Sequence, residues 1–339
     1  MDVIQLTREL VDIPSITEDE EAVGRYVFDY LKRLADAFRG RVERLEVSLN
    51  RYNIFAQWGE APTVTFSTHM DTVPPFFPSQ EDEDFVYGRG SCDAKGILAA
   101  MLVAVDNLLV ADVRNLGVLA LVGEERGSAG AIAAANVDRG ARYLINGEPT
   151  ENKLALGTKG ALRYELKATG RPAHSAYPEL GESAIEKLLD ALQKIRALSL
   201  PTDRILGAST MNIGTINGGS APNVIPAEAK AELLIRLVDD GKSTRRDLQE
   251  AVNGLLEVEE ILYIEAKLLE NRSGFATTTV AYTSDIPLLG DNWGKPFLMG
   301  PGSIHAAHTD HERVPKSELL VAVRLYEKLA RQLLKEVTE

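Results

Sequence analysis

The chain has 339 residues, more than the ~250–300 at which a single hydrophobic core usually stops growing, so we expect two domains. Its 37 basic and 50 acidic residues give a net charge of −13, which disfavours nucleic acids and anionic membranes as partners. The single cysteine, Cys92, excludes an internal disulfide, and no uncharged apolar run is long enough to span a bilayer. Because the first ten residues already carry charges and do not resemble a signal peptide, we expect a cytoplasmic protein.

Strand and helix patterns alternate along the first 150 residues. Thr17 to Glu20 reads as a capping box, and the helix that it opens carries an apolar stripe from Val23 to Leu34. Ser128 is the expected N-cap of a short helix that runs to Ala135. Further helices are expected over 2–12 and 97–109, and strands over 42–47, 53–58, 64–68, 117–122 and 142–145. This alternation predicts an α/β domain with a mostly parallel sheet flanked by helices.

The pattern changes after Gly160. From Leu162 to Ala168 apolar residues alternate with polar ones, as in a half-exposed strand. A helix over 182–198, strands over 209–216 and 229–238, a helix over 243–256 capped by Ser243, and a strand over 261–268 follow. The resulting β-α-β-β-α-β order is the ferredoxin-like split unit, which predicts an inserted domain over 159–269. Residues 1–158 and 270–339 would form the other domain, completed by strands over 280–283 and 297–300 and a helix over 317–337.

Two adjacent carboxylates follow one of the buried strands. The apolar run Gly117–Val122 ends at a glycine, and Glu124 and Glu125 come directly after it. In open α/β sheets, ligands bind beyond the carboxyl ends of strands, where such a turn lies. Two carboxylates there repel each other unless something neutralises them, and a bound cation would do so. An isolated Glu-Glu pair is more often a solvated surface pair, so the other strand ends decide between these interpretations.

Other predicted strand ends carry residues of the same kind. These are His69, Asp71, Asp93 and Glu148, joined by the late cluster His305-Ala-Ala-His308-Thr-Asp-His311. Imidazole and carboxylate without thiolate suit zinc, cobalt or manganese, and a bridging carboxylate can hold two metal ions ~3.5–4 Å apart. An aspartate behind a ligating His69 would fix the tautomer of the imidazole. A separate site made of the three late histidines, at helical steps of three, is an alternative.

Several stretches together resemble a known family, the dinuclear-zinc metallopeptidases and amidohydrolases. That family includes acetylornithine deacetylase, succinyl-diaminopimelate desuccinylase, carboxypeptidase G and aminoacylase. The matching stretches run in the family's order and span nearly the whole chain: Ser67–Pro74, Gly88–Gly96, Gly123–Glu125, Gly147–Thr150, Asn223–Pro226 and Gly300–His308. The inserted domain resembles the family's lid, which commonly dimerises. Within the family, Gly-Pro-Gly-Ser-Ile looks most like acetylornithine deacetylase and its relatives in lysine biosynthesis.

The resemblance implies a role for each matching residue. It implies two divalent metal ions, zinc with cobalt as the alternative, and a cis peptide between Asp93 and Ala94. The Gly-Pro-Gly register selects His308, which leaves His305 and His311 beside the ligands, facing substrate or exposed. The implied ligands are His69, Asp93 and Glu148 for one ion, and Asp93, Glu125 and His308 for the other, with Asp93 bridging. Asp71 would support His69, Glu124 would be the general base, and the lid residues Asn223, Arg236 and His174 would bind substrate or stabilise the oxyanion.

The expected function is hydrolysis of the amide bond of an N-acyl amino acid, as in acetylornithine deacetylase of arginine biosynthesis. Dipeptidase, carboxypeptidase and succinyl-diaminopimelate desuccinylase remain alternatives, and the resemblance favours a homodimer through the lid in which His174 serves the partner's site. A non-catalytic relic that binds amino acids would have no need of Glu124.

Serine chemistry is disfavoured because Gly218–Pro222 lacks the last glycine of a nucleophile elbow. Cys92 adjoins Asp93, whose charge would not favour a thiolate.

Overall fold

The computed structural model describes residues 2–337 and divides into two compact units. Unit 1 comprises Met1–Leu156, Leu269–Thr278 and Ser284–Glu339, and unit 2 comprises Gly157–Leu268 and Thr279–Thr283. The domain boundaries expected from the sequence, 158/159 and 269/270, lie close to these divisions. The short segment Thr279–Thr283 was expected in the first domain, but it belongs to unit 2.

Unit 1 is built on a six-stranded sheet with the order β1-β2-β6-β3-β7-β17. The strands β6, β3, β7 and β17 are parallel to one another, whereas β1 and β2 join the edge as antiparallel strands. The strand bounds are β1 Arg41–Ser48, β2 Arg51–Trp58, β3 Val64–His69, β6 Leu116–Leu121, β7 Tyr143–Asn146 and β17 Lys295–Leu298. The carboxyl ends of four parallel strands therefore meet at one edge of the sheet, where ligands bind in folds of this class.

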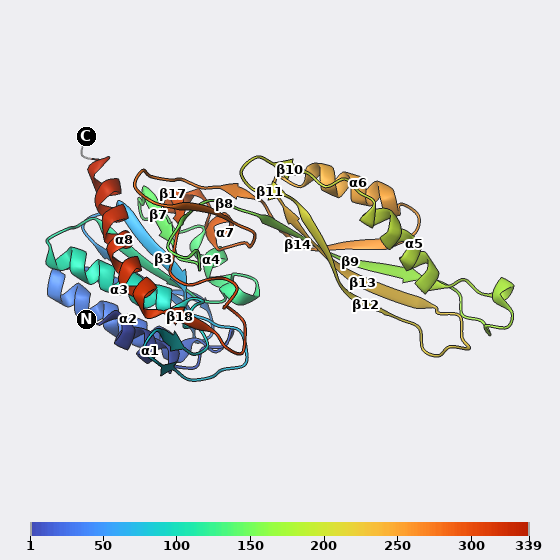
Figure 1. Ribbon diagram of the computed structural model, residues 1–339, viewed down its shortest axis with the longest axis horizontal. Helices are drawn as coiled ribbons and strands as arrows, with labels where there is room; N and C mark the ends of the chain where they lie inside the picture. Colours follow the sequence, from blue (N-terminus) through green and yellow to red (C-terminus); the bar gives the residue numbers. More distant parts are fainter. Residues whose placement is uncertain (1, 338–339) are drawn as a thin grey trace. The chain divides into compact units, whose positions relative to one another are not determined.

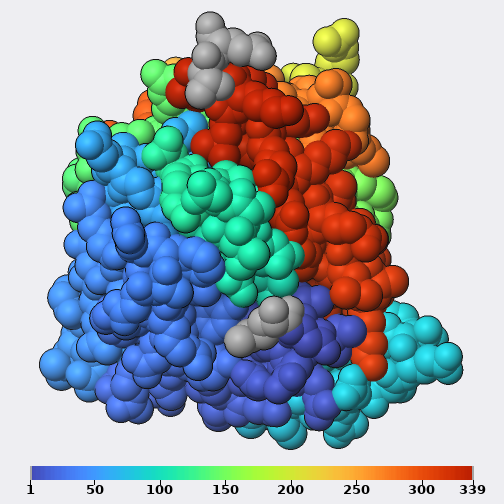
Figure 2. Space-filling view, turned by 90° about the vertical axis from the view of Figure 1, so that its left-hand side faces the viewer, coloured from blue at the N-terminus to red at the C-terminus, as the bar shows by residue number. Residues whose placement is uncertain are grey.

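Helices cover both faces of this sheet (Figure 1). The helices α1 (Val3–Val11), α2 (Glu21–Phe38), α3 (Lys95–Val110) and α8 (Lys316–Lys335) share one hydrophobic core with the sheet. Figure 2 shows α8, in red, passing across this side of the molecule, and it packs against α3. Because α3 also contacts α1 and the strands, it is apolar nearly all round. On the other face lie α4 (Ala129–Ala134) and α7 (Ile286–Leu289), where Phe55 and Trp293 meet edge to face at 5.5 Å.

Two of the predicted helix caps in unit 1 differ from the structure. The capping box at Thr17 is wrong, because α2 begins at Glu21 and the Thr17 hydroxyl donates to Asp71 at 2.8 Å instead. Glu20 occupies the N-cap position without a side-chain cap, since its carboxylate accepts from Arg51 at 2.7 and 2.8 Å. Ser128 stands at the N-cap of α4 in a left-handed conformation and makes no side-chain cap. In both cases a tertiary partner or backbone geometry outweighs the local capping preference.

Unit 2 has the predicted β-α-β-β-α-β order. Its antiparallel sheet has the order β12-β13-β9-β14, and α5 and α6 share one apolar core with it. The element bounds are β9 Gly160–Thr169, α5 Ala184–Arg196, β12 Thr210–Gly218, β13 Glu228–Leu237, α6 Lys242–Val252 and β14 Glu257–Ile264. The other face of the sheet carries charged side chains in ion pairs such as Lys167 with Glu259 at 2.8 Å. Ser243 is not a cap, because α6 begins one residue earlier, after Gly241.

Short elements complete the chain. They are β4 Gln80–Glu81, β5 Phe85–Tyr87, η1 Glu124–Arg126, β8 Leu154–Thr158, η2 Pro178–Leu180, β10 Thr202–Asp203, β11 Gly207–Ala208, β15 Lys267–Leu268, β16 Thr277–Val280, η3 Asp291–Trp293 and β18 Arg313–Pro315. Within residues 2–337, none of the helices combines the length and the apolar character that crossing a membrane requires.

Candidate metal centre

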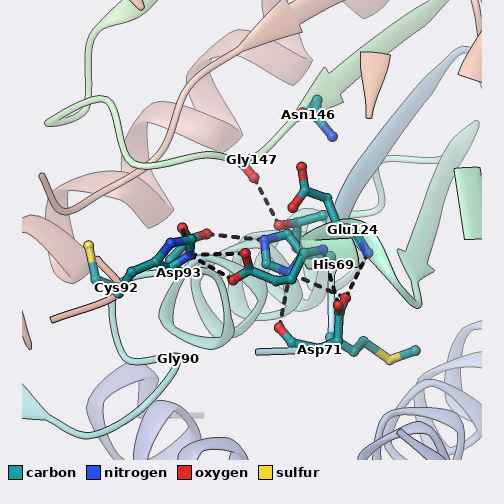
Figure 3. A network of polar contacts seen from close by, with 12 residues as sticks. His69, Asp71, Gly90, Cys92, Asp93, Glu124, Asn146 and Gly147 are labelled. Atoms are coloured by element: carbon teal, nitrogen blue, oxygen red, sulfur yellow. Dashed lines mark hydrogen bonds and ion pairs between the residues drawn. The ribbon is translucent and has the colours of Figure 1, made fainter. Parts of the chain in front are cut away.

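His69 ends β3 and is buried at the carboxyl edge of the sheet. Its Nδ1 lies 3.0 Å from the main-chain carbonyl oxygen of Asp71, and its Nε2 lies 3.1 Å from Oδ1 of Asp93 (Figure 3). A carbonyl can only accept, so Nδ1 carries the proton and the lone pair of a neutral Nε2 points toward Asp93. Burial opposes the charged form, but the two aspartates outweigh it and raise the pKa of His69 well above its ordinary value.

The carboxylate of Asp71 lies on the other side of His69 and holds the turn after β6 (Figure 3). It accepts the backbone N–H groups of Glu124 at 3.0 Å and Glu125 at 3.1 Å, and the hydroxyl of Thr17. Its Oδ1 is 3.6 Å from Nδ1 of His69, so the main-chain carbonyl is the closer support of the imidazole. Burial works against ionisation of Asp71, yet the imidazole and these donors lower its pKa.

Asp93 lies between the two histidines that the sequence selected. Its Oδ1 faces His69, and its Oδ2 is 3.4 Å from Nε2 of His308. The Asp93–Ala94 peptide is cis, as the resemblance implied. Despite full burial, the two imidazoles lower the pKa of Asp93, so its carboxylate is ionised and both oxygens can accept. This carboxylate is placed to be shared between two ligand groups.

Two groups of potential metal ligands meet at Asp93. The first combines it with His69 and Glu148, and the second with Glu125 and His308, and in each group the ligand atoms lie within 4.8 Å of one another. Nε2 of His308 is also 2.9 Å from Glu125. Glu148 follows β7, Glu125 follows β6, and His308 lies in the turns between β17 and β18. The structure thus brings all five expected metal ligands to one edge of the sheet.

The electrostatics of this cluster fit bound cations. Removal from water, together with the other carboxylates, raises the pKa of Glu124 and of Glu148 well above the ordinary range. Hydrogen bonds to Asp93 and Glu125 raise the pKa of His308 to about 10. An excess of carboxylates with two imidazoles and no thiolate is a donor set for two divalent ions such as zinc, cobalt or manganese. Cys92 stays outside this set, because burial raises the pKa of its thiol, which donates to the carbonyl oxygen of Ser303.

The late histidines do not form a site of their own among residues 2–337. His308 has a φ of 61°, and the surrounding residues form turns and no helix, so the three side chains do not share a helical face. Of the three, only His308 belongs to a ligand group. His305 and His311 are exposed and line a separate cavity of about 330 Å³ with Arg313 and Glu318.

Sequence reasoning missed Asp285, a buried acid whose charge acts on this centre. Its Oδ1 has no hydrogen-bond partner among the described residues, and burial raises its pKa to about 7. Its carboxylate in turn contributes to the raised pKa values of Glu124 and Glu148. The only local signal was an Asp in Ser-Asp-Ile-Pro, which reads as an ordinary helix start. The sequence also assigned no role to Arg89 and Glu312, which form a buried ion pair at 2.7 Å.

Two of the three expected substrate residues lie together in unit 2. His174 forms a main-chain bridge with Val224, and the N–H of Ser175 donates to the carbonyl oxygen of Asn223 at 3.0 Å. Nδ1 of His174 accepts the N–H of Ala176 at 3.1 Å, so a neutral imidazole carries its proton on Nε2. His174 and Asn223 are exposed. The loop therefore presents an N–H donor to solvent.

The third residue, Arg236, lies elsewhere in the same unit. It sits near the end of β13, opposite Ala161, whereas the start of β13 at Glu228 pairs with Thr169 near the His174 loop. Eight residues along a strand correspond to roughly 27 Å, so unit 2 does not bring Arg236 together with His174. Burial lowers the pKa of Arg236, and no acidic partner pairs with its guanidinium among the described residues. It is a half-buried cation without a counterion from the described chain.

Comparison with known proteins identifies the family. Residues 156–262 match the peptidase dimerisation domain of the M20 peptidases. The chain is 38% identical over 340 residues to a peptidase M20 domain-containing protein of Schizosaccharomyces pombe, covering 96% of this chain and 84% of that protein. The chain belongs to the M20 peptidase family. It is also 35% identical to a probable carboxypeptidase of Emericella nidulans, covering 96% of this chain and 88% of that protein.

Solved structures share the fold. The aminopeptidase PepT of Bacillus cereus superimposes with a TM-score of 0.79 at 19% identity, covering 98% of both chains. A dinuclear metal-binding M20 peptidase of Bacillus subtilis superimposes with a TM-score of 0.70 at 15% identity, also over 98% of both chains. The expectation of a helix-flanked catalytic domain with an inserted dimerisation domain is confirmed, as is that of an enzyme, a hydrolase of the metallopeptidase class.

Proposed function

We propose that this M20 peptidase holds two divalent metal ions, zinc or cobalt, in the two groups joined by Asp93. His69 and Glu148 would complete one site, and Glu125 and His308 the other. The observation that carries the proposal is the sharing of one buried, ionised carboxylate by two ligand groups. The bound ions would supply positive charge that polarises the amide carbonyl and makes water more acidic. The side chains of the same centre supply proton transfer and positioning.

Glu124 is the proposed general base. It lies in η1 beside the ligand Glu125, and Asp71 fixes the backbone N–H groups of both residues. Its carboxylate would take a proton from the attacking water as the new C–O bond forms. It would then give that proton to the amide nitrogen as the C–N bond breaks. Burial and the neighbouring carboxylates raise the pKa of Glu124, which favours the protonated form that the second step needs. Nearby cations would favour the ionised form that the first step needs.

The proposed substrate has a free carboxylate next to the scissile amide. The unpaired guanidinium of Arg236 suits a carboxylate, and the Nε2–H of His174 suits a developing oxyanion. Because the Emericella nidulans relative is named a probable carboxypeptidase, we favour removal of a C-terminal residue from a short peptide. Deacylation of an N-acyl amino acid is the second candidate, favoured by the Gly-Pro-Gly-Ser-Ile stretch. Both reactions release an amino acid from the same kind of amide.

We further propose a homodimer through unit 2. The roughly 27 Å between the two ends of β13 prevents one lid from placing both His174 and Arg236 on one small substrate. A second subunit would supply the missing histidine. The edge strand β12 and helix α5 expose Ile216 and Leu189, an apolar surface that a second copy would cover.

A metal-dependence assay on defined substrates tests the activity. Chelated protein should be inactive, and zinc or cobalt should restore hydrolysis of short peptides with a free C-terminus. The same peptides with an amidated C-terminus are the matched controls and should be poor substrates, because they lack the carboxylate proposed to pair with Arg236. Preference for N-acetyl amino acids over peptides would favour the second candidate. Full activity of metal-free protein, or indifference to the C-terminal carboxylate, would contradict the proposal.

A further inference from the structure

Glu312 is a fully buried carboxylate whose contacts converge on the loop of Asp93. Its Oε1 accepts three backbone N–H groups, from Gly90 at 3.0 Å, Cys92 at 3.1 Å and Asp93 at 3.0 Å. Figure 3 shows these three residues following one another along the loop that carries the Asp93 side chain toward His69. One oxygen therefore accepts three backbone N–H groups of the same turn. These bonds fix the direction in which the turn projects the Asp93 side chain.

The other oxygen of Glu312 binds Arg89. Nη1 of Arg89 donates to Oε2 at 2.7 Å, and its Nε donates to the carbonyl oxygen of Pro75 at 3.2 Å. The guanidinium also lies over the ring of Phe77, 4.9 Å from its centre. The two side chains are 1% and 0% exposed. The ion pair is thus enclosed, hydrogen-bonded on both sides and tied to a further segment of the chain.

The pair connects three segments, and each carries a proposed metal ligand. The segment after β3 leads from His69 to Pro75, the loop before α3 carries Asp93, and Glu312 lies four residues after His308. The N–H of Gly88 also donates to the main-chain carbonyl oxygen of Glu312 at 3.1 Å. Both the side chain and the main chain of this one residue therefore join the Asp93 loop to the His308 segment.

We infer that Glu312, clamped by Arg89, is a positioning residue that sets Asp93 and His308 at the spacing needed to share a metal ion. The inference rests on the proposed metal pair. It makes an unequal demand on the two sites, because Asp93 belongs to both groups whereas His308 belongs to the second alone. Two ligands of the second group therefore lie on segments that Glu312 joins, against one ligand, Asp93, of the first. His69 and Glu148 are held at the ends of β3 and β7, which do not depend on Glu312. A buried ion pair with a purely structural role would show no such preference between the sites.

Stepwise metal binding by Glu312→Gln tests this inference. One oxygen becomes an amide NH₂, so either the loop N–H groups or Arg89 loses its acceptor. Apoprotein is titrated with zinc in competition with a chromophoric chelator, and with cobalt while its visible spectrum is recorded. We expect the ion held by Asp93, Glu125 and His308 to bind about 10–100-fold more weakly, the usual effect of removing a partner of a ligand. The ion held by His69, Asp93 and Glu148 should lose less affinity, because only one of its ligands lies on a segment bound by Glu312.

Leu333→Ala is the matched control, because Leu333 is buried in α8 and belongs to the hydrophobic core of unit 1 but to neither ligand group. It should lower the melting temperature and leave both metal constants unchanged. If the second-site constant of Glu312→Gln stays within about twofold of wild type, or if the control reproduces the loss, the inference is wrong. If Glu312→Gln does not fold, Arg89→Lys takes its place, since it keeps the charge but cannot reach Pro75 and Glu312 together. A wild-type protein that binds fewer than two ions would instead overturn the proposed metal pair itself.

Discussion

Asp71 accepts the backbone N–H of Glu124 at 3.0 Å, so the residue behind the proposed ligand His69 also holds the turn that carries the proposed base. The adjacent N–H of Glu125 binds the other oxygen of the same carboxylate at 3.1 Å. Three side chains of the proposed centre, on two strand ends, therefore take their positions from one buried aspartate. Its contribution to the centre is mainly to fix this turn, because the imidazole is supported by its main-chain carbonyl.

Asp71→Asn should lower kcat about 10–100-fold while the protein remains folded and retains metal. The amide has one acceptor oxygen, so one of the two N–H groups of the turn must face an NH₂ group, and the turn shifts. Steady-state kinetics with metal analysis measures the effect. Thr17→Val is the control, since it removes only the hydroxyl that donates to Asp71 and should have a smaller effect. Equal losses in the two variants would contradict the role assigned to the N–H pair.

Glu124→Gln should reduce turnover by about 10²–10⁴-fold and leave two bound metal ions per subunit. The substitution keeps the size of the side chain and deletes the proton acceptor. Glu125→Gln is the matched comparison, because it changes a proposed ligand beside His308 and should lose metal from the second group. Metal stoichiometry and kcat are measured on both variants. If Glu125→Gln abolishes turnover with both ions retained while Glu124→Gln is mild, the two roles are exchanged.

Asp285→Asn should flatten the dependence of stability on pH in the metal-free protein. The folded state raises the pKa of Asp285 to about 7, whereas an aspartate in the unfolded chain titrates near 3.9. Between these values the folded state binds more protons, so the free energy of unfolding falls as the pH rises. The stabilisation that Asp285 contributes is fully present below about pH 4. It falls by up to about 1.4 kcal/mol per pH unit as the pH rises toward 7, and above about pH 7 it is lost.

Urea unfolding of chelated wild type and Asp285→Asn at several values between pH 4 and pH 8 measures this difference. The variant should lose stability less steeply over that window, because its amide does not ionise. Parallel curves for the two proteins would show that Asp285 titrates at its ordinary pKa.

Subunit mixing should restore activity if His174 serves the site of the partner subunit. His174→Ala and Glu124→Gln are each expected to be nearly inactive alone. A mixed dimer would regain one working site, with the histidine from one subunit and the base from the other. The two variants are unfolded together, refolded and assayed, with each variant refolded alone as the control. No recovery in a mixture shown to contain mixed dimers, or a fully active monomer, would refute sharing.

The periodicity and motifs of the sequence predicted most elements of the fold and the proposed ligands at the strand ends. Strand and helix periods depend on residues close together in the chain, so β3, β6 and the β-α-β-β-α-β unit were predictable. Motifs such as His69-Met-Asp71 keep their ligands within one turn of a strand end. Parallel pairing then brings these ends to one edge of the sheet.

The partner of each polar group in the site depends on long-range packing. Thr17 has the local signature of a helix cap, yet its hydroxyl binds Asp71, 54 residues away. Glu312 binds the Asp93 loop from 219 residues away, and nothing near it in the chain marks it. Asp285 is perturbed because packing removes it from water. Local propensity is worth about 1 kcal/mol, whereas an unsatisfied buried polar group costs about 1–3 kcal/mol, so long-range packing prevails at such positions.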